Sequence, residues 1–97
     1  MRKFEVCIRG RNFLIKRDGK VKRTGFYSAR FVEADDMSVA VGLAMDSLRD
    51  ALADVVVNDP SDPPVMNVED VEEVYFFEEN MLIGERVVPG NGFLWDE

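Results

Sequence analysis

The chain has 97 residues, 46% of them apolar and 32% charged, and a net charge of −7. This size and composition predict one folded domain over residues 1–97 and argue against disorder. No uncharged apolar run approaches the roughly 18 residues of a membrane span, and no apolar segment of a secretory signal follows the charged N-terminus. Cys7 is the only cysteine, so no disulfide can form within the chain. We expect a reducing, cytoplasmic location and no contact with a membrane.

Histidine is absent from the sequence. Neither a Ser-His-Asp nor a Cys-His nucleophile can therefore be built within one chain. The usual zinc sites also lose a ligand that one cysteine cannot replace. No phosphate-binding glycine loop is present either. We expect no enzymatic activity, no cofactor and no bound metal.

Residues 3–33 are predicted to form a long β-hairpin. Phe4, Val6 and Ile8 alternate with polar residues, and Asp18-Gly19 favours a two-residue turn with positive φ at both positions. If Asp18 and Gly19 form the loop, the residue numbers of each pair that face each other across the two strands add up to 37. The predicted pairs are Ile8 with Ala29, Val6 with Phe31, and Gly10 with Tyr27. A bulge at Gly10 would reverse the faces beyond it.

An unbroken register divides the hairpin into two faces. The apolar face, expected to pack on the core, holds Phe4, Val6, Ile8, Leu14, Val21, Tyr27, Ala29 and Phe31. The other face is basic and holds Arg9, Arg11, Arg17, Lys20, Lys22 and Arg30, with Cys7, Phe13, Ile15 and Phe26 among them. Guanidinium groups beside Cys7 would lower its thiol pKa and make it reactive, whereas burial would make it inert.

Residues 36–54 are predicted to form one long helix that Asp35 or Asp36 caps. Its apolar stripe, at spacings of three and four, consists of Val41, Ala44, Met45, Leu48 and Leu52. Three carboxylates spaced four apart form an acidic ridge on another side: Asp46, Asp50 and Asp54. Gly42 inside the helix suggests a close approach of its backbone to the sheet.

Residues 58–64 contain three prolines and are predicted to form a turn-rich connector. The next segment, 65–78, is ambiguous: Val68, Val71 and Val74 have helical spacing, whereas residues 72–77 are rich in strand formers, and we favour a strand there. Residues 81–88 are candidates for a short edge strand, and Trp95 for an anchor of the chain end. These elements predict an α+β fold of ββαβ(β) order, two-layered, with a mostly antiparallel sheet of three to four strands and one long helix packed on one face.

The most informative feature for function is the charge distribution. Residues 1–30 carry ten basic and two acidic side chains, and residues 31–97 carry two basic and seventeen acidic ones. Such asymmetry favours a charged partner. The carboxylate clusters, such as Asp59 with Asp62, are typical of solvated surface, and a hard-cation site is the alternative.

We expect a small non-catalytic protein-interaction or self-associating module, which binds a protein partner or a second copy as a homodimer. One alternative is binding of single-stranded nucleic acid, with cations along the backbone and Phe13 and Phe26 stacked on bases. Another is an acidic mimic of nucleic acid that occupies a basic partner. The candidate partner-binding residues are Arg9, Arg11, Phe13, Lys22, Phe26 and Arg30.

Overall fold

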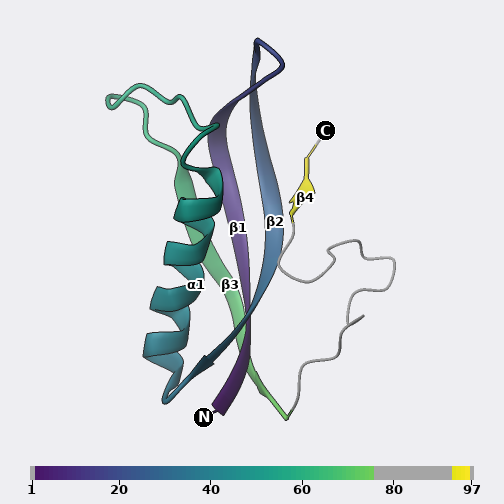
Figure 1. The fold of residues 1–97 in the computed structure, drawn as a ribbon, viewed down its shortest axis with the longest axis vertical. Helices are drawn as coiled ribbons and strands as arrows, with labels where there is room; N and C mark the ends of the chain where they lie inside the picture. The colour runs from purple at the N-terminus through teal and green to yellow at the C-terminus, as the bar shows by residue number, and fades with distance from the viewer. Residues whose placement is uncertain (1, 76–92, 97) are drawn as a thin grey trace.

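A computed structural model describes residues 2–75 and 93–96 of the chain. Its elements are β1 (Arg2–Arg17), β2 (Lys20–Ala34), α1 (Met37–Leu52), β3 (Val65–Val74) and the short β4 (Leu94–Trp95). The sheet has the order β3-β1-β2-β4, and every neighbouring pair is antiparallel. Three long antiparallel strands and one helix make the α+β fold that the sequence predicts (Figure 1). The candidate strand at 81–88 lies outside the described residues.

The turn of the hairpin forms at Asp18-Gly19, as predicted. Both residues have positive φ, 54° and 80°, which a two-residue turn between right-handedly twisted strands requires. From Arg17 opposite Lys20 to Phe13 opposite Thr24, the facing numbers sum to 37. The predicted register is therefore correct for the part of the hairpin nearest the turn.

Beyond Phe13 the predicted register is wrong, because β1 contains a bulge. Two residues of β1, 11 and 12, occupy the space opposite residue 25 of β2, and the pairing then resumes with Gly10 opposite Phe26. Ile8 consequently faces Ser28 and not Ala29. Asn12 adopts a φ of 61°, a conformation that asparagine tolerates better than most residues.

The bulge changes which side chains share a face, because it reverses the alternation of β1. Phe13 and Ile15 join Phe4, Val6 and Ile8 beneath the helix, and the residues of β2 on this face include Phe26 and Arg30. The resulting core contains Phe4, Val6, Ile8, Phe13, Ile15, Phe26, Ala34, Ala40, Ala44, Leu48 and Leu52. The predicted core face is therefore wrong for Leu14, Tyr27, Ala29 and Phe31, which are half-buried, and for Val21, which is exposed.

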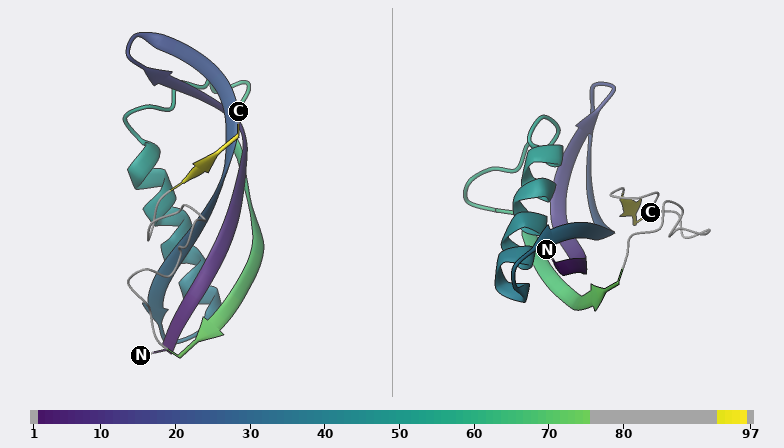
Figure 2. Two further views of the ribbon diagram at one scale, coloured as in Figure 1. Left: turned by 90° about the vertical axis from the view of Figure 1, so that its right-hand side faces the viewer. Right: turned by 60° about the horizontal axis from the view of Figure 1, so that its bottom comes forward.

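The helix forms where the sequence predicts it and lies along one side of the sheet (Figure 2). Asp36 is the N-cap, and its side chain accepts a hydrogen bond from the backbone N–H of Val39 at 2.9 Å. The buried stripe is Ala40, Ala44, Leu48 and Leu52, with Val41 and Met45 half-buried beside it. Gly42 is exposed and a Cβ there would meet nothing within 4 Å, so the expected close approach to the sheet is wrong. No helix among residues 2–75 and 93–96 is long and apolar enough to cross a membrane.

Within the ambiguous segment 65–78, residues Val65–Val74 form the strand β3, so the favoured strand is confirmed for 72–74; Tyr75 is a bend, and residues 76–78 lie outside the described residues. A second bulge explains the spacing of Val68 and Val71: Cys7 faces Asp70 while Ile8 faces Val68, so Glu69 is an extra residue on β3. Val74 lies opposite Lys3, on the other face of the strand. Val68 and Val71 lie three apart in sequence, yet both oppose core residues of β1. The connector before β3 extends the sheet edge, because Lys16 N–H donates to Val55 O at 2.8 Å and Val57 N–H donates to Leu14 O at 2.9 Å.

Candidate functional site

The part of the hairpin nearest the turn extends past the end of α1 (Figure 1). We call residues 16–23 the basic tip, since five of the eight side chains are cationic and only Asp18 is acidic. All eight residues are exposed. The cations of the basic tip are Lys16, Arg17, Lys20, Lys22 and Arg23.

Three of these cations share one face of the tip, as the sequence predicts. Arg17 lies directly opposite Lys20, and Lys22 lies opposite Ile15. They border a depression of about 250 Å³, which we call the tip pocket. The residues that line it are Ile15, Arg17, Lys20, Lys22, Thr24, Trp95 and Asp96. The pocket therefore combines an apolar floor with a cationic rim.

An aromatic cluster supports the tip pocket from below. Trp95 packs edge-on against Phe26, with 5.4 Å between ring centroids, and stacks with Phe93 at 5.2 Å. The guanidinium carbon of Arg17 lies 4.8 Å from the centroid of the Trp95 ring. Trp95 thus contacts the aromatic ring of Phe26 and also one cation of the pocket, Arg17, through a cation–π contact.

Asp96 is the one carboxylate in the lining of the tip pocket, and it is engaged elsewhere. Arg9 donates to both of its carboxylate oxygens, at 2.8 and 3.1 Å. A Cβ on Gly25 would lie 2.6 Å from the backbone oxygen of Gly10 and 2.7 Å from Asp96 Oδ2, so a larger residue there would displace the backbone of β1 as well as the carboxylate. Thr24 Oγ1 donates to the Asp96 carbonyl at 3.0 Å and ties the same segment to β2. The negative charge of Asp96 is therefore neutralised by Arg9, and the pocket keeps its positive charge.

The structure does not assemble the basic, aromatic surface that the sequence predicts. Phe13 and Phe26 are buried against each other, with 5.0 Å between their ring centroids, and cannot stack on a ligand. Arg30 is also buried, and Arg9 is paired with Asp96. Of the six candidates, Arg11 and Lys22 are the exposed ones, and only Lys22 lines the tip pocket.

Arg30 is a buried cation beneath the helix with few partners. Its Nη1 donates to Ser47 Oγ at 3.3 Å, and its guanidinium carbon lies 5.0 Å from the centroid of Phe93. Among residues 2–75 and 93–96, Nε and Nη2 find no hydrogen-bond partner. Burial lowers the pKa of Arg30, because the charged form loses its hydration.

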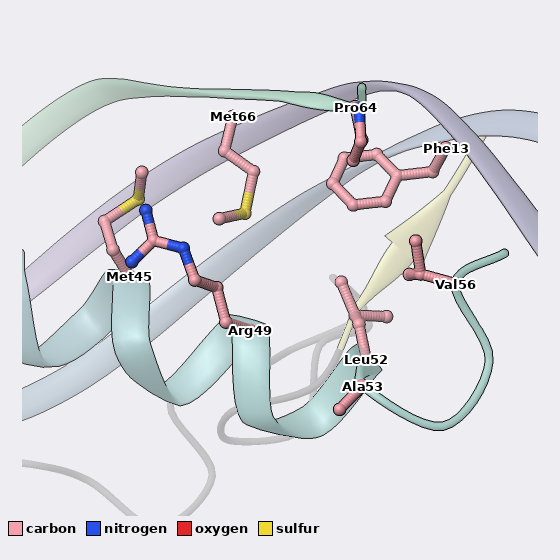
Figure 3. Close-up of a pocket in the computed structure, with 8 residues that line it drawn as sticks. All are labelled: Phe13, Met45, Arg49, Leu52, Ala53, Val56, Pro64 and Met66. Carbon is pink, nitrogen blue, oxygen red and sulfur yellow. The ribbon is translucent and has the colours of Figure 1, made fainter. Parts of the chain in front are cut away.

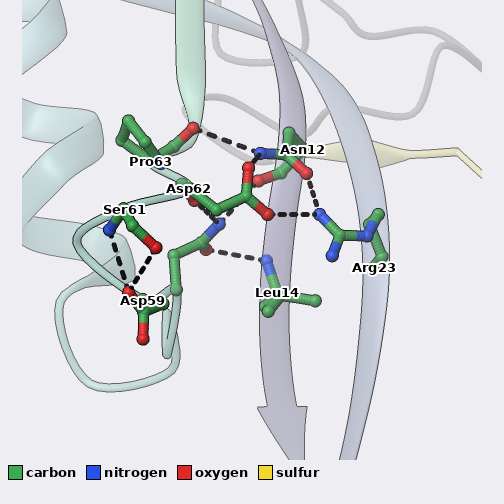
Figure 4. Close-up of polar contacts among 8 residues, drawn as sticks. Asn12, Leu14, Arg23, Asp59, Ser61, Asp62 and Pro63 are labelled. Carbon is green, nitrogen blue, oxygen red and sulfur yellow. Dashed lines mark hydrogen bonds and ion pairs between the residues drawn. The ribbon is translucent and has the colours of Figure 1, made fainter.

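A polar network joins the connector to the bulge (Figure 4). Asn12 Nδ2 donates to Asp62 Oδ1 at 2.9 Å, and Arg23 donates to Asn12 Oδ1 and to Asp62 Oδ2. Asn58 Nδ2 donates to Asn12 O at 2.8 Å, while Leu14 N–H donates to Asn58 Oδ1. The positive φ of Asn12 is thus fixed by its own side-chain contacts.

Asp59 and Asp62, for which a cation site was the alternative to solvated surface, are exposed and hold this loop together. Asp59 accepts from the backbone N–H and the hydroxyl of Ser61, and these bonds lower the pKa of Asp59. Asp62 is held by Asn12 and Arg23. Within the described part of the chain, no group of three Asp, Glu, Cys or His side chains is placed to hold a metal ion.

A second depression, of about 300 Å³, lies between the end of α1 and the start of β3 (Figure 3). Its lining is mostly apolar: Phe13, Met45, Arg49, Leu52, Ala53, Val56, Pro64 and Met66. Arg49 donates to Asp46 at 3.1 Å on the helix surface. A groove with so few polar groups offers little to orient a ligand, so the tip pocket is the better candidate site.

The sequence reasoning identified Arg17 and Lys20 as basic residues of the hairpin but did not choose them as site residues, and it missed Asp96. The density of cations around Asp18-Gly19 is the signal that could have found the tip. No protein-family model, curated protein or solved structure matches this chain.

Proposed function

We propose that this chain is a non-catalytic binding module that holds an acidic protein surface, on a partner or on a second copy, through its basic tip. The observation that carries the proposal is a group of four exposed cations, Lys16, Arg17, Lys20 and Lys22. None of them has an ion pair with any residue that the structure describes. In this proposal, residues 93–96 supply the last strand of a two-layer ββαβ(β) scaffold and keep Trp95 under the tip.

The charges of the whole chain favour a protein over a nucleic acid. The net charge is −7, and the acidic ridge, formed by Asp46 and Asp50 on α1 and Asp54 in the turn just after it, is exposed. A long polyanion would pass within a few Debye lengths of these carboxylates, whereas a compact acidic surface can touch the tip alone. The same ridge offers a second copy of the chain a surface that is complementary to the tip.

The test uses Trp95, the only tryptophan, as a fluorescent reporter at the site. An oligoglutamate peptide should change its emission at low salt, and the effect should weaken as salt screens the contact. Lys20→Glu with Lys22→Glu should abolish the response. Arg49→Glu reverses an exposed cation on α1 and serves as the control, which should still respond. A response that survives the double reversal would contradict the proposal.

Whether the partner is a second copy of the chain is tested by sedimentation equilibrium of the protein alone. A second copy as partner predicts a dimer that dissociates with added salt and in the Lys20→Glu, Lys22→Glu variant. A monomer at all concentrations, together with a Trp95 response to oligoglutamate, would assign the tip to a different acidic protein.

Single-stranded nucleic acid is the second candidate, and the observation that favours it is the run of exposed cations in the basic tip. Binding of that kind would fall with salt at a slope of roughly −0.7 per phosphate contact. We expect no tight binding of an oligonucleotide at physiological salt. Tight binding that Lys20→Glu abolishes would reverse the order of the two candidates.

A further inference from the structure

The tip pocket contains a charge arrangement that is unfavourable unless an anion is bound. Arg17 and Lys20 are directly opposite each other in the antiparallel pair, and Lys22 follows two residues later on the same face. Side chains directly opposite have Cβ atoms about 4.5–5.5 Å apart, and like charges at that distance destabilise the sheet. Unfavourable local arrangements of this kind, here like charges on facing strands, are expected at functional sites.

No carboxylate among the described residues offsets these three cations. Asp96 is paired with Arg9 on both of its oxygens, and Asp18 at the turn forms no ion pair with described residues. The floor of the pocket, Ile15 and Trp95, is apolar, so the field of the cations is less screened there than in open solvent. Arg17 is also held in place over Trp95 before any ligand arrives.

A phosphate monoester matches this pocket better than a carboxylate or a nucleobase does. It carries a charge of about −1.5 to −2 and three acceptor oxygens, against three cations on the rim. The guanidinium fork of Arg17 can donate two hydrogen bonds to one phosphate. A nucleobase would need an open aromatic face, but Trp95 is stacked with Phe93 and lies under Arg17. The volume of about 250 Å³ suits one phosphate group with a short stem.

We infer that the tip pocket binds a phosphate monoester, carried by a phosphorylated side chain of the acidic protein partner. Arg17, Lys20 and Lys22 contact the phosphate oxygens, and Trp95 positions Arg17. This inference rests on the proposed function, because it names the group that the basic tip recognises.

The experiment compares an acidic peptide containing one serine with the same peptide phosphorylated at that serine, with Trp95 emission as the readout. Phosphorylation should tighten binding by about tenfold or more, since it adds one to three charge-assisted hydrogen bonds. Lys20→Gln should remove this preference. Arg49→Gln removes the same charge from an exposed position on α1, away from the tip, and should keep it. Arg17→Lys should weaken it, because an ammonium group cannot bind in a bidentate manner.

The outcomes separate the inference from the proposed function. Equal binding of both peptides, lost in Lys20→Glu with Lys22→Glu, would overturn the phosphate site and leave the acidic partner intact. No binding of either peptide would overturn both. If inorganic phosphate binds as tightly as the phosphopeptide, the inference that the phosphate is carried by a protein side chain would be overturned. Tighter binding of a single-stranded oligonucleotide than of the phosphopeptide would overturn the inference in favour of nucleic acid.

Discussion

Replacing Gly10 with alanine probes the bulge of β1 most sharply. A Cβ at Gly10 would lie 2.5 Å from Cζ and 2.7 Å from Cδ2 of Phe26, and closer still to Cε2. The ring cannot move aside freely, because Phe26 is fully buried and contacts Phe13, Phe93 and Trp95 with centroid distances of 5.0–5.4 Å. Gly10→Ala should therefore displace the ring at the centre of the aromatic cluster.

The magnitude follows from three contributions. Overpacking a core typically costs about 1–3 kcal/mol. Each aromatic pair that is disturbed adds up to about 0.5–1.5 kcal/mol. Alanine regains about 0.5–1 kcal/mol relative to glycine in a strand. We expect Gly10→Ala to lower the free energy of unfolding by about 2–4 kcal/mol.

The assay is urea unfolding of a double-mutant cycle with Phe26→Ala, which alone should cost about 3–5 kcal/mol. Once the ring is gone, Gly10→Ala should be neutral or slightly stabilising. An equal cost of Gly10→Ala with and without the Phe26 ring would refute the placement of Phe26 over Gly10, and with it the register shift.

Three further predictions concern stability. Arg30→Met removes a buried guanidinium of which two nitrogens have no hydrogen-bond partner in the described part of the chain, and it should raise the free energy of unfolding by about 1–3 kcal/mol. A lower stability in urea would contradict this. Asp36→Ala removes the helix cap and should cost about 1 kcal/mol, whereas the control Asp35→Ala should cost less. Arg2 lowers the pKa of Glu73, so their contact stabilises the fold at neutral pH and is lost as the pH falls through that lowered pKa. In a plot of the free energy of unfolding against pH, Glu73→Gln should therefore flatten the acid side. An unchanged plot would exclude this contribution.

Local sequence signals predicted the elements that depend on neighbouring residues. Asp18-Gly19 identified the turn because its positive φ values are a property of those two residues. Asp36 and the stripe through Leu48 likewise identified the helix and its buried side. These features need no knowledge of the rest of the chain.

The bulges could not be predicted, because packing far along the chain decides them. The bulge before Phe13 places Phe13 and Phe26 on the same face as Phe4, Val6 and Ile8, under the helix, and Asn12 accommodates it with contacts to Asp62, fifty residues later. Alternating hydrophobicity alone favours an unbroken register, which assigned Phe26 to the opposite face. The ambiguity of β3 has in part the same origin, since the bulge at Glu69 places Val68 and Val71 on one face although they lie three residues apart.

The candidate site was predicted in part. The cations of the basic tip are evident from the sequence, and their shared face followed from the correct register near the turn. The pairing of Trp95 with Phe26, and the ion pair of Asp96 with Arg9, join residues about seventy and ninety positions apart, and no local pattern indicates them. The aromatic floor of the tip pocket therefore became visible only in the fold.

The most direct test of the basic tip as the binding element is an NMR titration of the isotope-labelled protein with the phosphorylated acidic peptide. Binding at the tip predicts chemical-shift changes in the backbone amides of residues 15–24 and in the indole N–H of Trp95, with the amides of α1 unaffected. Shift changes centred on Arg9 and Arg11, with the tip unaffected, would contradict it.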